Sequence, residues 1–183
     1  MRYAGFWPRF WALLIDFFVF IPLIWTTFWS LSTSRSTALL LEVPLGVLAA
    51  FYSIYFVGRW GQTVGKMMIG IKVVAVDGSK VGYTRAFYRH SVDLGFSAVS
   101  TALTILALLS VSSGEYDRLS FEGKLDLLAT HTPSWNSLID WLTFAWIGSE
   151  LVVLLLNEKR RALHDYIAGT VVVHTSTEVP VEV

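Results

Sequence analysis

The hydrophobic positions of the chain gather into four long apolar segments separated by polar stretches. The hydrocarbon core of a bilayer is about 30 Å thick, and a helix that rises about 1.5 Å per residue crosses it in roughly 20 residues. Each segment reaches about that length, and we predict membrane-spanning helices at about Phe10–Leu31, Leu39–Val57, Tyr88–Val111 and Trp135–Leu156. The predicted fold class is an all-α transmembrane protein, a four-helix membrane bundle.

The composition agrees with a protein that lies in lipid. Of the 183 residues, 54% are hydrophobic and 15% are charged, whereas an average soluble domain has about 25% charged residues. The formal net charge is zero, which argues against nucleic-acid binding, because phosphates are usually neutralised by a basic excess. The chain has no cysteine, so disulfides, a thiolate nucleophile and cysteine-ligated metals are excluded.

The basic residues predict the orientation, since cytoplasmic loops are enriched in Lys and Arg. With four spans both termini lie on one side, and 11 of the 14 basic residues fall on that side, counting the loop between the second and third spans. These are Arg2, Arg9, Arg59, Lys66, Lys72, Lys80, Arg85, Arg89, Lys159, Arg160 and Arg161, against Arg35, Arg118 and Lys124 on the other side. We therefore predict a multi-pass protein of the cell membrane, plasma or inner, with cytoplasmic N- and C-termini.

The cytoplasmic loop 58–87 has the pattern of a β-hairpin. A β-branched run at Ile69–Val76 is followed by the turn signal Asp77-Gly78, after which Lys80–Tyr83 can return as a second strand. An isolated two-stranded hairpin is marginal in water. We therefore expect further structure to join it.

The segment after the fourth span supplies that structure. Lys159–Ala168 is typical of a short amphipathic helix, and the β-branched stretch Thr170–His174 is predicted to be a third strand that completes a small cytoplasmic cap. The external loop 112–134 is acidic and has a predicted surface helix at Leu119–Ala129. Residues 176–183 are predicted to be a disordered tail.

Signatures of catalysis are absent from the sequence. Gly61–Lys66 resembles a phosphate-binding loop, but its glycine spacing is one residue short and Met67 stands where a Mg²⁺-binding Ser or Thr is required. The four histidines lack metal-ligand spacing. We accordingly predict no enzyme, no catalytic residue, no cofactor and no metal.

Acidic residues inside the predicted spans are the informative ones, because a lone charge at mid-bilayer costs about 2.5–3.5 kcal/mol and needs a partner or a wet cavity. They are Asp16, Glu42, Asp93, Asp140 and Glu150. Arg89 and Asp93 are four residues apart on one helical face and can pair directly. Arg9 and Asp16 are seven apart, about 10 Å along the helix axis, so one of them is expected to reach another helix.

These ionisable residues also carry a resemblance to a known family. Arg9 at the head of the first span, Asp16 within it and Asp93 in the third span match the arginine and two aspartates that name the RDD family of membrane proteins. Other matching segments follow in the same order: Phe6-Trp7-Pro8-Arg9-Phe10, Leu14-Ile15-Asp16, Gly61-Gln62-Thr63-Val64-Gly65-Lys66, Gly70-Ile71-Lys72-Val73-Val74 and Arg161-Ala162-Leu163-His164-Asp165-Tyr166-Ile167-Ala168-Gly169-Thr170. The resemblance implies one RDD-like membrane domain over residues 1–175. The family is commonly described with three spans, whereas four are predicted here.

What the resemblance implies about function is movement of an unidentified ion or small ligand. We predict that Arg9, Asp16 and Asp93 converge near the cytoplasmic side, with Arg89 close by, as a buried polar or transport centre for ions or protons. The alternative is a non-enzymatic membrane scaffold or partner-binding protein in which these residues are structural. Four spans enclose little volume, so a transporter of this size is expected to form a homo-oligomer within the lipid bilayer.

Overall fold

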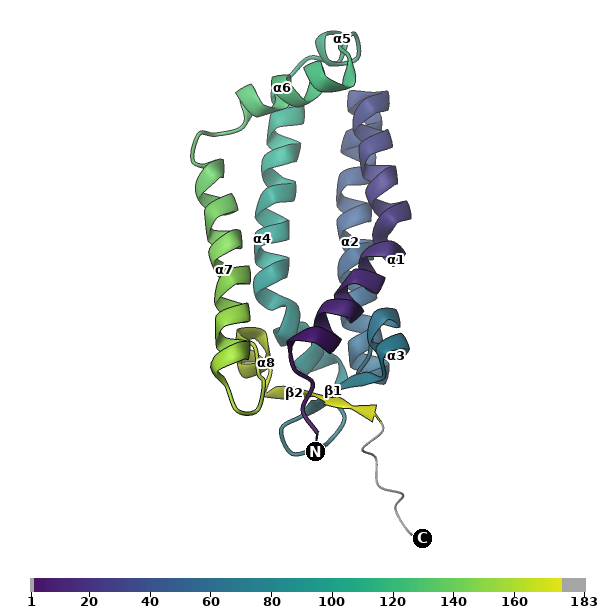
Figure 1. Cartoon of the computed structure of the whole chain (residues 1–183). Coiled ribbons are helices and arrows are strands. Elements are labelled where there is room, and N and C mark those ends of the chain that lie inside the picture. Colours follow the sequence, from purple (N-terminus) through teal and green to yellow (C-terminus); the bar gives the residue numbers. More distant parts are fainter. Residues whose placement is uncertain (1, 176–183) are drawn as a thin grey trace. The chain divides into compact units, whose positions relative to one another are not determined.

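The computed structural model describes residues 2–175 and is mostly helical (Figure 1). Two antiparallel strands interrupt the helices. In chain order the elements are α1 Phe6–Thr33, α2 Arg35–Trp60, α3 Val64–Ile69, β1 Ile71–Ala75, α4 Gly82–Ser110, α5 Ser113–Tyr116, α6 Phe121–His131, α7 Asn136–Leu156, α8 Leu163–Ile167 and β2 Thr170–His174.

Four helices, α1, α2, α4 and α7, are long and apolar enough to cross a membrane. Each overlaps one of the predicted spans, and the predicted fold class is confirmed. Only 6–17% of the most apolar window of each helix is buried inside the structure. Side chains such as Leu13 and Trp141 are 68% and 72% exposed, an arrangement that suits lipid and would be costly in water.

The chain divides into two compact units. Each of the four long helices has one part in unit 1 and the other part in unit 2. Unit 1 comprises the described parts of 1–19, 51–92 and 145–183, and unit 2 comprises 20–50 and 93–144. Unit 1 therefore contains the first part of α1, the last of α2, the first of α4 and the last of α7, together with both strands.

The sheet of unit 1 joins segments about a hundred residues apart in sequence. β1 and β2 pair antiparallel, with Val73 opposite Val172 and Val74 opposite Val171, so the predicted pairing of these two segments is confirmed. The backbone of residues 2–4 lines the other edge of β2, where Ala4 donates to the Val172 carbonyl at 2.8 Å. We call β1, β2 and residues 2–4 the strand cap.

The predicted return strand at Lys80–Tyr83 is wrong. The chain does turn at Asp77-Gly78, and Ala75 donates to the Ser79 carbonyl at 3.0 Å, but α4 already begins at Gly82. Val81 is buried in the cluster that joins the strand cap to the long helices. That cluster contains Ala4, Ala12, Val57, Ile71, Val73, Val81, Ala86 and Val172. Burial of Val81 thus directs the chain into α4 and leaves β2 as the partner of β1.

The short helices α8 and α3 also differ from the sequence prediction. α8 is shorter than the predicted helix because residues 157–160 form a turn, in which the Arg160 amide donates to the Asn157 carbonyl and Arg160 has a φ of 49°. α3 was not predicted. It is defined by Thr63, whose hydroxyl accepts from the Lys66 amide, and by Gly70, whose φ of 70° ends the helix.

In unit 2 the loop at 112–134 folds onto the ends of the long helices. The predicted surface helix is present as α6, and the buried Tyr116 donates its hydroxyl proton to the Leu31 carbonyl at 2.8 Å. Lys124 donates to the carbonyls of Ser32 and Thr33 at the end of α1. Arg35 donates to the Leu108 carbonyl near the end of α4 at 2.6 Å. Both cations satisfy carbonyls that a helix end leaves without partners. The predicted tail at 176–183 lies outside the described residues.

Candidate functional site

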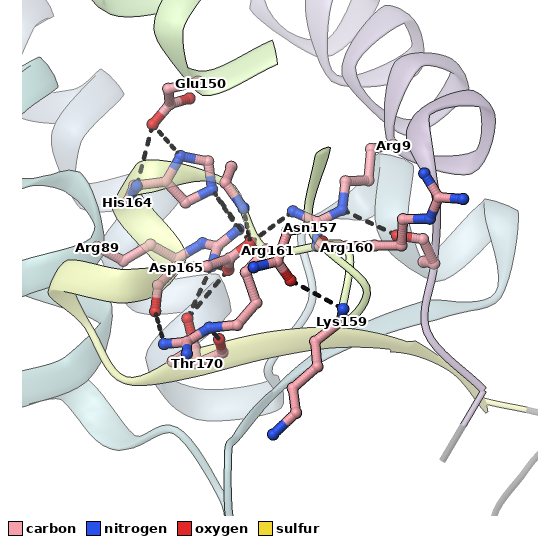
Figure 2. Close-up of polar contacts among 12 residues, drawn as sticks. Arg9, Arg89, Glu150, Asn157, Lys159, Arg160, Arg161, His164, Asp165 and Thr170 are labelled. Carbon is pink, nitrogen blue, oxygen red and sulfur yellow. Dashed lines mark hydrogen bonds and ion pairs between the residues drawn. The ribbon is translucent and has the colours of Figure 1, made fainter. Parts of the chain in front are cut away.

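The carboxylate of Asp165 is the centre of an ionic network in unit 1 (Figure 2). Asp165 is fully buried. Its Oδ2 accepts from Arg9 Nη1 at 2.7 Å and from the Ala162 amide at 3.0 Å. Its Oδ1 accepts from Arg89 Nη1, and from Thr170 Oγ1 at 3.1 Å. Both oxygens are therefore saturated by donors, as a buried carboxylate requires.

The two arginines use their remaining donors on other partners. Arg9 Nε donates to the Ala4 carbonyl at 3.2 Å, and Arg9 Nη2 donates to the Arg160 carbonyl at 2.6 Å. Arg89 Nη1 also donates to Thr170 Oγ1 at 2.9 Å. The rigid guanidinium fork lets each arginine join Asp165 to a second segment. The network consequently fastens α1, α4 and α8 to the strand cap.

His164 extends the network to α7. Arg89 Nη2 lies 2.7 Å from His164 Nε2, and because a guanidinium can only donate, Nε2 must accept. The proton of the neutral ring is therefore on Nδ1, which hydrogen-bonds Glu150 Oε1. Burial and the adjacent Arg89 lower the pKa of His164, which favours this neutral tautomer.

The pKa of Asp165 reflects the same geometry. Burial alone would raise that pKa, but the guanidinium groups of Arg89 and Arg9 outweigh burial and hold it well below its usual range. Asp165 therefore stays ionised across the physiological pH range. The contact of the permanently charged Asp165 carboxylate with the two arginine cations holds α1, α4 and α8 together, and we call it the ionic tie.

Asp16 has a separate and different shell, also in unit 1. Asp16 is 8% exposed, and its Oδ1 accepts from Tyr52 Oη and from the Gly65 amide, both at 2.8 Å. Its Oδ2 accepts from Thr63 Oγ1 at 2.5 Å. These three donors are uncharged. Asp16 belongs to the membrane-spanning helix α1. Its carboxylate lies at the N-terminus of α3 and accepts hydrogen bonds from two hydroxyls and one peptide N–H.

This arrangement explains the segment that resembles a phosphate-binding loop. Thr63 and Gly65 direct their donors at the Asp16 carboxylate where such a loop would hold a phosphate. Gly65 is needed for the close approach, because a Cβ there would lie 2.0 Å from the Ala12 carbonyl oxygen. The anion at this helix N-terminus is thus supplied by the chain itself.

Lys66 lies beside the Asp16 shell. Its Nζ is 3.4 Å from Thr63 Oγ1, the atom that donates to Asp16. Burial, reinforced by the positive charge of Arg89, lowers the pKa of Lys66 to about 8. Lys66 can therefore lose its proton within about a pH unit of neutrality, unlike an ordinary surface lysine.

The structure treats the predicted site residues in three ways. Arg9 and Arg89 are brought together, on Asp165. Asp16 is held by Tyr52, Thr63 and Gly65. Asp93 lies one turn after Arg89 in α4, is exposed and belongs to unit 2. The convergence of all four residues in one centre stays a prediction.

Sequence reasoning missed Asp165, Thr63 and Lys66 as members of the polar clusters. Asp165 lies in the segment predicted as a short amphipathic helix, Lys159–Ala168, and also in one of the segments that carry the family resemblance. Within residues 2–175 no three His, Asp or Glu side chains gather as a metal site would require.

Four apolar membrane-spanning helices with a buried ionic network define a small multi-pass membrane protein. A model of the RDD family matches residues 3–169, and the chain belongs to this family. Two proteins of Bacillus subtilis (strain 168) are similar to it. The uncharacterised membrane protein YteJ is 30% identical over 131 residues, 64% of this chain and 77% of YteJ. The uncharacterised protein YckC is 26% identical over 175 residues, 94% of this chain and 85% of YckC. No solved structure matches the chain significantly.

Replacing Gly65 by alanine tests the close approach of α3 to α1. The new Cβ would meet the Ala12 carbonyl oxygen at 2.0 Å, so backbone must shift, and we expect a loss of about 1–3 kcal/mol in stability. Gly148→Ala in α7 is the matched control, because a Cβ there meets nothing within 4 Å. It should be neutral or stabilise by about 0.5–1 kcal/mol. Thermal unfolding in detergent measures both, and equal unfolding temperatures for the two variants would contradict the packing.

Replacing Asp165 by asparagine tests the ionic tie. At neutral pH the variant leaves two buried arginines uncompensated, and we expect a loss of about 3–5 kcal/mol. The depressed pKa of Asp165 contributes stability that is present above its unfolded value, about 3.9, and is lost as pH falls through the folded value. Unfolding measured between pH 7 and pH 2 should therefore depend less on pH in Asp165→Asn than in the wild type. Asp126→Asn, at an exposed position of α6, should keep the wild-type profile. If Asp165→Asn and Asp126→Asn changed the pH dependence of unfolding equally, the result would contradict the ionic tie.

Proposed function

We propose that this RDD family protein moves protons or monovalent cations across the cell membrane and that Asp16 is the exchange group. The observation that carries the proposal is the shell of Asp16: a carboxylate in a membrane-spanning helix, held by uncharged donors. Carboxylates inside membranes are the usual relays for protons and cations.

The contrast with Asp165 supports the choice of Asp16. Asp165 is bound by two arginines, and removing its charge would leave both cations unpaired. The partners of Asp16 include two hydroxyls, and a hydroxyl can accept as well as donate. The Tyr52 and Thr63 hydroxyls can therefore reorient when Asp16 takes up a proton. The same carboxylate can be charged or neutral without loss of its hydrogen bonds.

Lys66 is the proposed proton partner of Asp16. Its Nζ and Asp16 Oδ2 both contact Thr63 Oγ1, at 3.4 Å and 2.5 Å. A proton from the Lys66 ammonium passes to the Thr63 hydroxyl, which gives its own proton to Asp16. The ammonium of Lys66 becomes an amine and the carboxylate of Asp16 becomes a carboxylic acid, without change of net charge. The other charged groups that act on Lys66 are Arg89, Arg9 and Asp165.

The proposed orientation places the strand cap in the cytoplasm. All 11 basic residues of the predicted cytoplasmic side belong to unit 1, whereas Arg35, Arg118 and Lys124 belong to unit 2. Two of these three have another task, since Arg35 and Lys124 bind carbonyls at helix ends. Cations on the cap side, such as Arg9 and Arg89, also bind within the protein, so the proposed orientation rests on the count of 11 to 3. A homo-oligomer remains part of the proposal, because one chain encloses little volume.

A membrane scaffold is the second candidate. The Arg9–Asp165–Arg89 network favours it, because a saturated buried ion pair orders helices without doing chemistry. Under this reading Asp16 also serves only to fix α3 on α1. The two candidates differ in what a neutral residue at position 16 does to flux.

Flux through proteoliposomes separates the candidates. Purified protein should move H⁺, Na⁺ or K⁺ down an imposed gradient, and Asp16→Asn should lower that flux at least tenfold, because asparagine keeps the shape and some hydrogen bonding but cannot titrate. Asp126→Asn is the control and should keep wild-type flux. Absence of flux in the wild type would reject transport in favour of the scaffold. Wild-type flux in Asp16→Asn would reject Asp16 as the exchange group. If Asp16→Asn fails to fold, Tyr52→Phe, which deletes one donor, should alter the pH profile of flux.

Reporter fusions test the orientation. A reporter after the last residue and one inserted at Gly78 should both read cytoplasmic, while one near Gly123 should read external. The reason is the excess of basic residues on the cap side. A cytoplasmic reading at Gly123 would contradict the four-span topology, and external readings at the first two positions would invert it.

A further inference from the structure

A basic pocket lies on the strand cap, apart from the two carboxylate clusters. Its volume is about 350 Å³, and it is formed by the end of α2, the approach to α3, β1 and the segment before α4. Three cations line it: Arg59, Lys72 and Lys80. The described residues that line it include no carboxylate. The pocket thus concentrates positive charge from three segments that are separate in sequence.

The floor of the pocket is built by the backbone around Gly61. Val73 donates to the Gly61 carbonyl at 2.7 Å, and Gly61 has a φ of 72°. A Cβ at Gly61 would lie 2.5 Å from the Val73 carbonyl oxygen and 3.1 Å from Lys72 Cγ. The stem of Lys72 therefore passes directly over Gly61. Glycine at this position leaves the hollow open and lets the lysine lie along it.

The pocket also has apolar lining residues, among them Trp60 and Met67. Trp60, the last residue of the spanning helix α2, is 42% exposed and packs against Tyr55 and Phe56, with ring centroids 5.5 and 5.0 Å away. Met67 of α3 also lines the pocket, and Met67 and Met68 are 40% and 69% exposed. Tryptophan at the end of a span and exposed apolar side chains beside basic ones are typical of the lipid–water interface.

We propose that this pocket binds the phosphate group of an anionic phospholipid from the adjoining leaflet. Arg and Lys are the side chains that bind phosphate best, and three of them line the pocket. The pocket opens at the end of a membrane helix, where Trp60 and Met67 can contact the acyl chains of the same molecule. This continuity of charge and apolar surface favours a lipid over a soluble phosphate compound.

The test uses the full-length protein in detergent and native mass spectrometry of bound lipid. The protein is titrated with phosphatidylglycerol, phosphatidylcholine or glycerol 3-phosphate. Each basic residue near an anionic headgroup strengthens binding roughly fivefold. We expect the wild type to prefer phosphatidylglycerol to phosphatidylcholine at least tenfold. The triple variant Arg59→Gln, Lys72→Gln, Lys80→Gln should lose that preference, and glycerol 3-phosphate should not compete.

A variant of equal charge controls for general electrostatics. Arg2→Gln, Arg85→Gln, Lys159→Gln removes three cations of unit 1 outside the pocket and should keep the preference. An equal loss in both triple variants would overturn the pocket, as would a wild type without preference. Pocket-dependent binding of glycerol 3-phosphate alone would overturn the lipid in favour of a soluble phosphate. If the triple pocket variant does not fold, the single variants at the exposed positions Arg59 and Lys80 should each weaken phosphatidylglycerol binding, and unchanged binding in both would also reject the proposal.

Discussion

The carboxylate of Asp165 is held by two arginines that come from two different membrane helices, and most of unit 1 depends on this contact. Arg9 joins it from the start of α1 and Arg89 from the start of α4. Each charge would be too costly to bury alone, and together they can be buried only in one geometry. The tie therefore does more than add stability. It fixes which turn of α1 and which turn of α4 meet the strand cap, and through His164 it reaches Glu150 of α7.

The ionic tie sets the register of α1 against the strand cap, and this register positions the Asp16 carboxylate. Seven residues after Arg9, Asp16 faces the start of α3, where Thr63 and Gly65 donate to it. The ionic tie and the neutral shell thus share one helix but have opposite electrostatic character. Asp165 has a charge that its surroundings make permanent. Asp16 is surrounded by uncharged donors.

Hydropathy was enough to find the four long helices, because a membrane span is defined by length and apolar content, which are local properties. The pairing of Val73–Val76 with Val171–Val173 also followed from local pattern, since each segment was too short to persist alone. The prediction of a return strand at Lys80–Tyr83 was wrong because Val81 is buried by tertiary contacts, which the local sequence pattern does not reveal. Either Arg9 or Asp16 was expected to reach another helix, and the partner of Arg9, Asp165, is 156 residues away in sequence. No local pattern distinguishes that aspartate from a surface one.

The same separation has a consequence for biosynthesis. Arg89 and Asp165 are 76 residues apart, and a ribosome that adds about 5–20 residues per second needs roughly 4–15 s to cover that distance. Throughout this interval Arg9 and Arg89 have been synthesised but their counter-ion Asp165 has not. The backbone of residues 2–4 likewise has no β2 strand with which to form hydrogen bonds. The strand cap can close only after the fourth helix has been made. A chain that stops before Asp165 therefore has two arginines without their counter-ion and a strand edge without its partner.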